Sequence, residues 1–303
     1  MMSKKHGIDL KPGTHIIGKW HQNQYIIQRK LGSGTVGTVY LCESNGQKFA
    51  LKISKQNSSI TVEVNVLKEF AKVQGINLGP SLVDIDDFET NHGTYSFYVM
   101  EYLRGESISQ FIRRNGSEWI GVFMLQLLAD LDKLHHHGWV FGDLKAENLL
   151  VVSHPTRIRW VDVGGTTQIG RAIKEYTEFY DRGYWGLGTR KAEPSYDLFA
   201  FVMVFLSIYY PNYFSKTVKS KQTIYQKIDK VQPLKPYSYC LKKAINGEYH
   251  SSVEMKQDLV SILYSWRKGR TLDQGKNRLP LFIESGGILL LSVIYYLSSK
   301  LLF

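Results

Sequence analysis

A cluster of polar residues in the middle of the chain has the residue types and the spacing that phosphoryl transfer requires. Asp143, Lys145 and Asn148 stand in the order Asp-x-Lys-x-x-Asn, and Asp162 heads an Asp-x-Gly sequence after a strand-like run. A carboxylate can orient an attacking hydroxyl, a lysine can neutralise phosphate charge, and carboxylate and amide oxygens can hold Mg²⁺. These residues therefore predict an enzyme that transfers a phosphoryl group.

A glycine-rich turn upstream could hold the phosphates of a nucleotide. Gly32, Gly34 and Gly37 lie between two predicted strands, residues 25–27 and 39–41. In a dinucleotide-binding fold a helix would follow the glycines, so the strand that follows here argues against that fold. The backbone amides of a glycine-rich hairpin can approach phosphates closely, because no side chain holds the backbone away.

Two further residues complete a series that extends along the chain. Lys52 lies on the next predicted strand, 49–53, and Glu63 lies on a predicted helix, 60–73; each taken alone is typical of a solvated surface. Together with the glycine-rich turn and the polar cluster, they make the chain resemble the eukaryotic-like (Hanks-type) protein kinases over about residues 25–266. The resemblance implies an α+β fold of two lobes, with a small antiparallel-sheet N-lobe and a mostly helical C-lobe.

The resemblance also implies a role for each matching residue. Asp143 would be the catalytic base, Lys145 would contact the transferred phosphate, and Asn148 and Asp162 would bind Mg²⁺ or Mn²⁺. Glu63 would pair with the lysine on the neighbouring strand. A lysine two residues after the base is typical of serine/threonine kinases. The residues expected to bind ATP, including two in a hinge at 100–103, are Gly32, Gly34, Gly37, Val39, Ala50, Lys52, Glu101 and Leu103.

Other positions fit the family or depart from it. Thr177 is expected near the approach of the substrate hydroxyl, and Asp197, which opens an apolar helix, resembles the buried aspartate that braces the catalytic loop. Phe141 and Gly142 stand where the family has His-Arg, so the arginine that gathers an activation-loop phosphate is missing. Activation by loop phosphorylation is therefore not expected. The end of the activation segment stays unassigned, with Tyr184 near the place of the family's glutamate.

Composition and charge limit the possible partners. The 303 residues are 43% hydrophobic, which excludes a disordered chain, and the only cysteines, Cys42 and Cys240, fit a reducing compartment. The net charge is +11, and residues 215–280 contain 14 basic and 5 acidic residues. This surplus predicts a polyanionic partner for the basic region 216–278, either DNA or an anionic membrane, although a solvated face of the C-lobe would look the same.

The C-terminus has the pattern of a membrane anchor. No charge interrupts residues 285–299, and a helix over 285–303 would be about 28 Å long, close to the thickness of a hydrocarbon core. We expect an N-lobe at 1–101, a C-lobe at 102–270, a basic linker at 271–280 and a transmembrane helix at 281–303. The basic linker places the kinase domain in the cytoplasm, and no cleaved signal peptide is expected. An amphipathic or buried terminal helix is the alternative.

Three functions remain open at this stage. The leading one is a membrane-anchored serine/threonine protein kinase that phosphorylates proteins and itself, the latter through transient self-association. The chain resembles short, tail-anchored bacterial kinases that are associated with sporulation, and this implies stimulation by DNA. A small-molecule kinase of the aminoglycoside type would share the catalytic loop and the metal aspartate. A catalytically silent, polyanion-binding scaffold at the membrane is the third.

Overall fold

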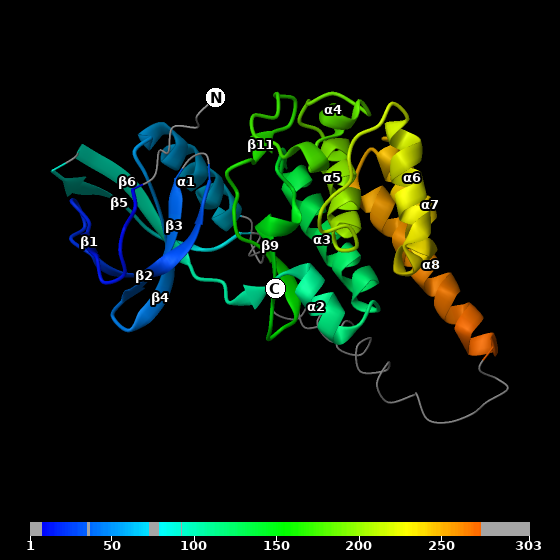
Figure 1. The fold of residues 1–303 in the computed structure, drawn as a ribbon, viewed down its shortest axis with the longest axis horizontal. Helices are drawn as coiled ribbons and strands as arrows, with labels where there is room; N and C mark the ends of the chain where they lie inside the picture. Colours follow the sequence, from blue (N-terminus) through cyan, green and yellow to red (C-terminus); the bar gives the residue numbers. More distant parts are fainter. Residues whose placement is uncertain (1–7, 35–36, 73–78, 92, 274–303) are drawn as a thin grey trace. The chain divides into compact units, whose positions relative to one another are not determined.

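The computed structural model describes residues 8–34, 37–72, 79–91 and 93–273 (Figure 1). A first compact unit extends to Leu259, so its boundary falls inside helix α8 (Ser252–Asp273). Within this unit, an antiparallel sheet formed by the first part of the chain is followed by a mostly helical part. The predicted α+β architecture of a sheet lobe and a helical lobe is thereby confirmed.

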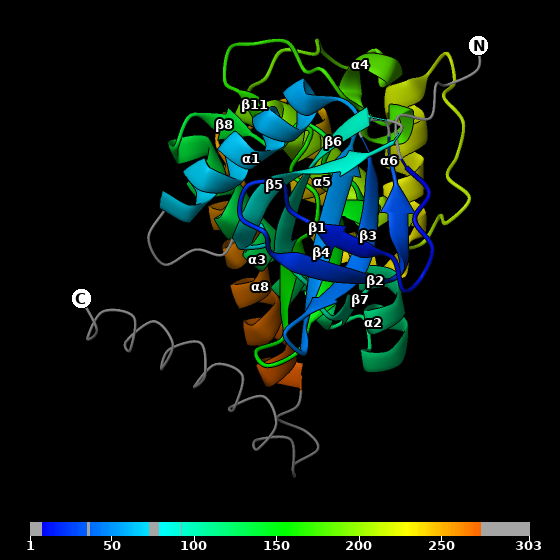
Figure 2. The same cartoon turned by 90° about the vertical axis from the view of Figure 1, so that its left-hand side faces the viewer.

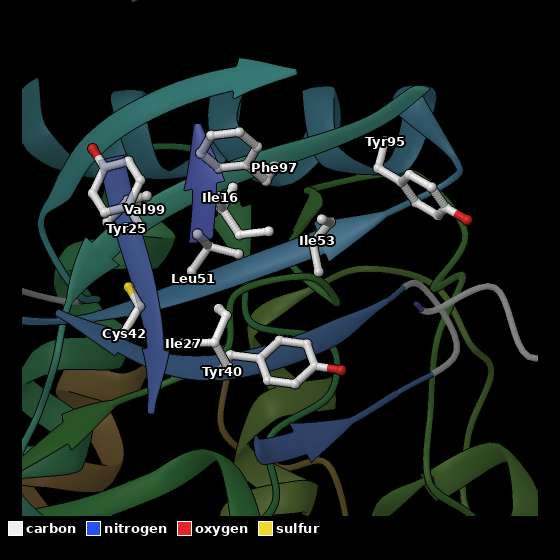
Figure 3. Packing of buried hydrophobic residues seen from close by; sticks show 10 residues of the cluster. All are labelled: Ile16, Tyr25, Ile27, Tyr40, Cys42, Leu51, Ile53, Tyr95, Phe97 and Val99. Atoms are coloured by element: carbon white, nitrogen blue, oxygen red, sulfur yellow. The ribbon is translucent and has the colours of Figure 1, made fainter. Parts of the chain in front are cut away.

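The first lobe is built on a six-stranded sheet with the strand order β1-β2-β3-β4-β6-β5. Side chains alternate between its two faces, as the period of two in a strand requires. One face carries a buried apolar core that includes Tyr40, Leu51 and Phe97 (Figure 3). The strands are β1 (His15–Ile17), β2 (Gln24–Ser33), β3 (Thr38–Ser44), β4 (Gln47–Ser54), β5 (Leu82–Thr90) and β6 (Gly93–Glu101).

Strand β1 is an addition that the sequence pattern did not predict, because three residues are too few to show an alternation. Ile16 at its centre is fully buried in the core of the sheet, and Ile8 and Leu10 pack against the same core. The hydroxyl of Tyr40 donates a hydrogen bond to the carbonyl of Ile8 at 2.6 Å and accepts one from the amide of Leu10 at 3.0 Å. The segment before β2 thus covers one face of the sheet.

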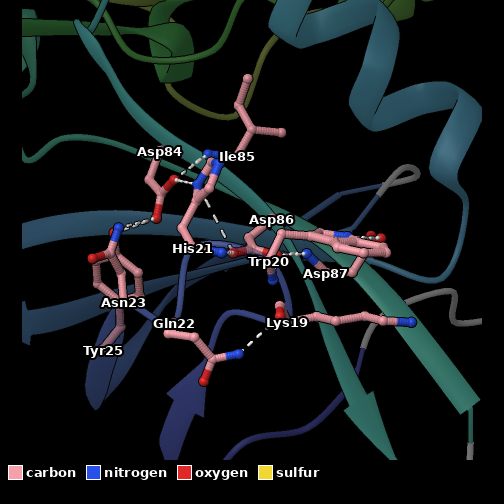
Figure 4. A network of polar contacts seen from close by, with 10 residues as sticks. All are labelled: Lys19, Trp20, His21, Gln22, Asn23, Tyr25, Asp84, Ile85, Asp86 and Asp87. Carbon is pink, nitrogen blue, oxygen red and sulfur yellow. Dashed lines mark hydrogen bonds and ion pairs between the residues drawn. The ribbon is translucent and has the colours of Figure 1, made fainter.

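Acidic side chains of β5 hold the turn between β1 and β2 in place (Figure 4). Asp84 accepts hydrogen bonds from the Tyr25 hydroxyl at 2.7 Å and the Asn23 amide at 3.0 Å, and it lies 2.7 Å from Nδ1 of His21. Asp86 accepts bonds from the backbone amides of Trp20 and His21, at 2.9 and 2.7 Å. These bonds connect β5, at one edge of the sheet, to the segment that follows β1.

Helix α1 (Asn57–Lys72) belongs to the sheet lobe and contacts β4, β5 and β6 (Figure 2). It begins three residues before the predicted helix. Lys52 of β4 and Tyr98 of β6 both contact Glu63 on α1, whereas their neighbours Leu51 and Phe97 point into the core of the other face. Alternation along the two strands therefore separates the polar side of the sheet from its apolar side.

The helical lobe surrounds a mostly apolar helix, α5 (Pro194–Ser207), whose residues from Tyr196 to Ser207 are all buried. Proline at the first position of α5 favours a helix start. Another helix, α2 (Ile108–Asn115), begins with a capping box formed by Ser107 and Gln110. The other helices are α3 (Trp119–His136), α4 (Arg182–Trp185), α6 (Ser220–Lys230), α7 (Ser238–Ile245) and α8.

Short strands and 3₁₀ turns of this lobe carry the polar cluster. They are β7 (Gly105–Glu106), β8 (Trp139–Val140), β9 (Leu149–Val152), β10 (Arg157–Trp160), β11 (Thr167–Gln168) and the turns η1 (Ala146–Asn148), η2 (Glu178–Tyr180) and η3 (Gln232–Tyr237). In the part of the chain that the structure describes, no helix is long and apolar enough to cross a membrane. The predicted anchor at 281–303 lies outside the described residues.

Candidate active site

Lys52 and Glu63 form a buried ion pair between the sheet and α1. The Nζ atom of Lys52 lies 2.6 Å from Oε2 of Glu63 and 3.5 Å from Oδ1 of Asp162, and Tyr98 donates a hydrogen bond to Oε2 of Glu63 at 2.7 Å. Burial lowers the pKa of Lys52, but the carboxylates of Asp162 and Glu63 outweigh it and raise that pKa above its ordinary value. The lysine is therefore charged where the sequence places the phosphates.

Asp143 and Lys145 meet in the loop between β8 and β9. The ammonium of Lys145 forms an ion pair with Oδ2 of Asp143. The Thr177 hydroxyl donates to Oδ1 of Asp143 at 3.2 Å and lies 3.3 Å from the Lys145 ammonium. Asn148 donates from its side-chain amide to the backbone carbonyl of Asp143 at 2.9 Å. Lys145 and Thr177 thus lie beside the Asp143 carboxylate, and Asn148 holds the backbone of the same residue.

Asp197 braces this loop from the start of α5. Its carboxylate is completely buried and accepts hydrogen bonds from the amides of Phe141 and Gly142, at 2.7 and 3.0 Å. His135 at the end of α3 provides a third contact, since its Nε2 atom lies 2.9 Å from Oδ2 of Asp197. The other ring nitrogen of His135 lies 3.0 Å from the Ser252 hydroxyl. Buried carboxylates need such partners, so the loop and the helix hold each other.

The backbone at Gly142 leaves no room for an arginine before Asp143, the predicted catalytic base. Its φ is +78°, a conformation that L-residues with side chains rarely adopt. A Cβ atom added there would lie 2.3 Å from the carbonyl oxygen of Gly165, far inside van der Waals contact. The ring of Phe141, where the family has histidine, packs against Trp160 instead, with the ring centroids 4.7 Å apart.

The oxygen atoms that could ligate a divalent metal are free. The side chain of Asn148 uses only its amide nitrogen in hydrogen bonding, and the side chain of Asp162 uses Oδ1, which accepts from the Gly164 amide at 2.9 Å. Among the described residues, Oδ1 of Asn148 and Oδ2 of Asp162 make no hydrogen bond. Hard oxygen donors of this kind fit Mg²⁺, which keeps waters and takes phosphate oxygens as further ligands. Within the same residues, no group of three or more His, Cys, Asp or Glu could hold a metal alone.

The glycine-rich turn is a closed hairpin between β2 and β3. The amide of Gly34 donates to the carbonyl of Gly37 at 2.9 Å, and residues 35–36 lie outside the described residues. Around Gly32 and Gly34 there is open space for an added Cβ, whereas at Gly37 such an atom would lie 2.6 Å from the Ile53 carbonyl oxygen. Only the last of these glycines is therefore required by packing within the lobe itself.

Val39, Ala50 and Lys52 lie on the polar side of the sheet, since Val39 stands opposite Lys52 in the β3–β4 register. Leu103, just beyond β6, is buried. Glu101 at the end of β6 is already engaged, because Arg159 donates to its Oε2 at 2.9 Å. The structure thus places Val39, Ala50 and Lys52 on one side of β3 and β4, whereas Glu101 stands opposite Phe49 and its side chain is bound to Arg159 of β10.

Sequence reasoning missed the contacts that end the activation segment. Asp181 caps α4 and forms an ion pair with Arg190 at 2.7 Å, and Arg182 pairs with Glu193 at 2.6 Å. Asp181 is completely buried, and Arg182 is nearly so. Only an aspartate ahead of a short helix signals this arrangement in the sequence. Tyr184, which lies within α4, contacts the ammonium of Lys216 with its ring rather than an arginine.

The basic region is only partly free of intramolecular partners. Lys242 pairs with Asp229 at 2.7 Å and Lys243 with Asp258 at 2.9 Å. Lys216 donates to the Tyr184 carbonyl at 2.5 Å, and Lys227 lies over the ring of Tyr210. Four lysines are exposed, and their ammonium groups make no ion pair or hydrogen bond with the described residues: Lys219, Lys221, Lys230 and Lys235.

Comparison with known proteins agrees with this geometry. The chain is 51% identical over 253 residues to the serine/threonine-protein kinase YabT of Bacillus subtilis (strain 168), covering 83% of this chain and 75% of that protein. The sporulation protein kinase mde3 of Schizosaccharomyces pombe is 30% identical over 212 residues, which are 62% of this chain and 38% of that one. The structure of vaccinia related kinase 3 shares the fold, with a TM-score of 0.62 at 17% identity over 86% of this chain and 93% of that chain.

The family follows from the extent of the match and from the site together. Residues 25–271 match the family described as protein kinase domain. Members of this family use ATP and a divalent metal, generally Mg²⁺. Of the three functions that the sequence left open, the match and the kinase relative support the protein kinase. The chain therefore belongs to the protein kinase family and is an ATP-dependent serine/threonine protein kinase.

Proposed function

We propose that this kinase transfers the γ-phosphate of ATP to protein serine and threonine hydroxyls, with Asp143 as the base that orients and deprotonates the acceptor. The observation that supports this most directly is the contact of a hydroxyl, that of Thr177, with Oδ1 of Asp143 at 3.2 Å. A hydroxyl thus already occupies hydrogen-bonding distance from this carboxylate, as a general base requires. Lys145, paired with the same carboxylate, lies where it can contact the transferred phosphate.

The remaining residues position the reacting groups and neutralise the charge of the phosphates. Lys52, held by Glu63, binds the phosphates of ATP, and the pair keeps α1 close to β4. Asn148 and Asp162 would hold Mg²⁺, which neutralises phosphate charge when bound. Asp197 keeps the backbone of the catalytic loop in place through the amides of Phe141 and Gly142. Phosphoryl transfer needs positioning and charge neutralisation above all, and these residues supply both.

The matched test compares two lysines of β4. Lys52→Met should reduce phosphate transfer by about 10²–10³-fold or more, because a positioned charge on the phosphates is lost. Lys48→Met is the control, since Lys48 lies on the same strand, is exposed and stands opposite Glu43. Activity is measured with labelled ATP and a protein substrate. Full activity of Lys52→Met would show that the nucleotide site has been placed wrongly.

We also propose that DNA stimulates the enzyme by binding the exposed lysines of the basic region and by bringing kinase molecules together for trans-autophosphorylation. Two observations support this: the surplus of positive charge between residues 215 and 280, and the exposed lysines there whose ammonium groups have no partner among the described residues. Lys219, Lys221 and Lys230 are better candidates than Lys216 and Lys227, whose ammonium groups contact aromatic rings within the lobe.

The test changes three of these lysines at once. Lys219, Lys221 and Lys230 replaced together by Gln should lower the DNA affinity and reduce the salt slope by about 2.7, at about 0.9 per lost phosphate contact. The control is the same change at three exposed lysines of the sheet lobe, Lys11, Lys48 and Lys68. An equal loss of DNA affinity in both triple variants would mean that the total positive charge, wherever it lies, determines binding. An unchanged salt slope in the variant of Lys219, Lys221 and Lys230 would contradict the proposal.

A third part of the proposal concerns location. Residues 281–303 anchor the kinase in the cell membrane as a single C-terminal span, with the kinase domain in the cytoplasm. The uncharged run at 285–299 and the basic residues before it support this. Deleting 281–303 should release the enzyme from the membrane fraction. Release of the full chain by high salt alone would argue for a peripheral helix instead.

A further inference from the structure

An acidic residue of the activation segment faces the catalytic centre and has no assigned role. Exposure alternates along the segment: Ile173, Glu175 and Thr177 are buried or half-buried, and Lys174 and Tyr176 between them are exposed. Such alternation indicates an extended chain in which every second side chain points the same way. The Thr177 hydroxyl contacts Asp143, so the same side of the segment, with Glu175, faces the catalytic aspartate.

The opposite side of the segment is anchored elsewhere, which supports this orientation. The ring of Tyr176 stacks under the guanidinium of Arg190, whose carbon lies 4.0 Å from the ring centroid. Arg190 is in turn paired with the buried Asp181. Tyr176 is therefore held on the side away from the catalytic loop, and Glu175 beside it is held toward that loop.

The carboxylate of Glu175 is half-buried and has no direct partner, since among the described residues it makes no hydrogen bond and no ion pair. Burial and the negative charges of Asp162 and Asp143 raise the pKa of Glu175, and together they outweigh the positive charges of Lys52 and Lys145, which lower it. The two lysines nearby are already engaged, Lys52 with Glu63 and Lys145 with Asp143. A half-buried carboxylate beside two others is unfavourable unless a cation joins it when the site is in use.

The position of Glu175 selects the kind of cation. Asn148 and Asp162 already offer free oxygen atoms to a metal. Glu175 belongs instead to the segment in which Thr177 lies beside the proposed base, on the side where the acceptor hydroxyl is expected. Two residues of extended chain span about 6.6 Å, so a cation on Glu175 lies within a few residues of the acceptor hydroxyl. We propose that Glu175 binds a lysine or arginine side chain of the protein substrate, within about three residues of the phosphorylated serine or threonine.

This inference rests on the proposed acceptor site at Asp143 and deepens it by naming a basic substrate class. The test uses alanine-based peptides with one serine and a single arginine, glutamate or alanine at each position within three residues of it. The readout is the ratio of kcat/KM for the arginine peptide to that for the alanine peptide. We expect a ratio of about ten for the wild type at the best position, and a ratio near one for Glu175→Gln.

Two more variants isolate the charge. Glu175→Arg should reverse the preference, so that the glutamate peptide becomes the better substrate. Glu178→Gln is the matched control, because Glu178 is an exposed acid of the same segment, and it should keep the wild-type ratio. The same peptides with alanine in place of the serine serve as non-reacting ligands, and their affinities should show the same ratios without any phosphate transfer.

The outcomes separate this inference from the proposed function. A wild-type ratio near one at every position, or an unchanged ratio in Glu175→Gln, would overturn it. A higher Mg²⁺ requirement in Glu175→Gln with an unchanged peptide ratio would assign the carboxylate to the metal and also overturn it. An inactive wild type would contradict the proposed function, whereas the affinity ratios of the non-reacting peptides would still decide the role of Glu175.

Discussion

Replacing Gly142 by alanine tests whether the catalytic loop requires glycine before its aspartate. The φ of +78° at this position costs an L-residue about 1–2 kcal/mol. The added Cβ would also lie 2.3 Å from the Gly165 carbonyl oxygen, and ordinary contact begins at 3.4 Å, so one of the two backbones must move by about 1.1 Å. Gly165 itself packs on Asp143, since a Cβ on Gly165 would lie 2.6 Å from the Asp143 Cβ. The displacement therefore reaches the base.

We expect two separable effects of Gly142→Ala. A misplacement of about 1 Å at a reacting group can cost about 100-fold in rate, so kcat should fall by about that factor. The free energy of unfolding should fall by more than the 1–2 kcal/mol that the backbone conformation alone costs. Phosphate transfer to a protein substrate and urea unfolding measure the two quantities.

Gly138 provides the matched control. Its φ is +79°, almost the same, but an added Cβ there would meet nothing within 4 Å. Gly138→Ala should therefore lose only the conformational part of the stability and keep its kcat within a few fold of wild type. If Gly142→Ala and Gly138→Ala lose the same stability and the same activity, the contact with Gly165 does not constrain the loop and the reasoning is refuted.

Three further expectations concern other contacts. Glu101→Gln should destabilise the fold by about 3 kcal/mol, because it leaves the buried Arg159 without a carboxylate partner. Arg159→Met should cost less, because Glu101 is partly exposed. Equal losses of unfolding free energy for the two variants, measured by urea unfolding, would contradict this. Burial raises the pKa of Asp84, but its hydrogen bonds outweigh this and hold the pKa below the ordinary 3.8. Wild type should therefore have a higher free energy of unfolding than Asp84→Asn above pH 4, and this difference should vanish as the pH falls through the lowered pKa. Unfolding curves of both proteins at several pH values would check this. Asp197→Asn should lower kcat with little change in the KM for ATP, because the carboxylate acts on the loop; a change confined to KM would argue against bracing.

The sequence by itself determined the chemistry and much of the architecture. Asp143, Lys145 and Asn148 stand close together in the sequence. They could therefore be assigned to one loop from the sequence alone. Strong apolar runs predicted α5 as a buried helix, and alternation predicted the strands around the glycine-rich turn. Local patterns of this kind depend on neighbours in the chain, which a single sequence contains.

Tertiary structure decided what depends on residues far apart in the chain. Three residues of β1 show no pattern of their own, and β1 exists because Ile16 fills a core made by other strands. The pairs Asp181–Arg190 and Arg182–Glu193 end the activation segment, yet nothing in their spacing indicates which acid meets which base. Glu175 could not be distinguished from any exposed acid until the fold had brought it to the side of Asp143. Burial and charge pairing arise from packing between distant segments, and only the folded chain contains that information.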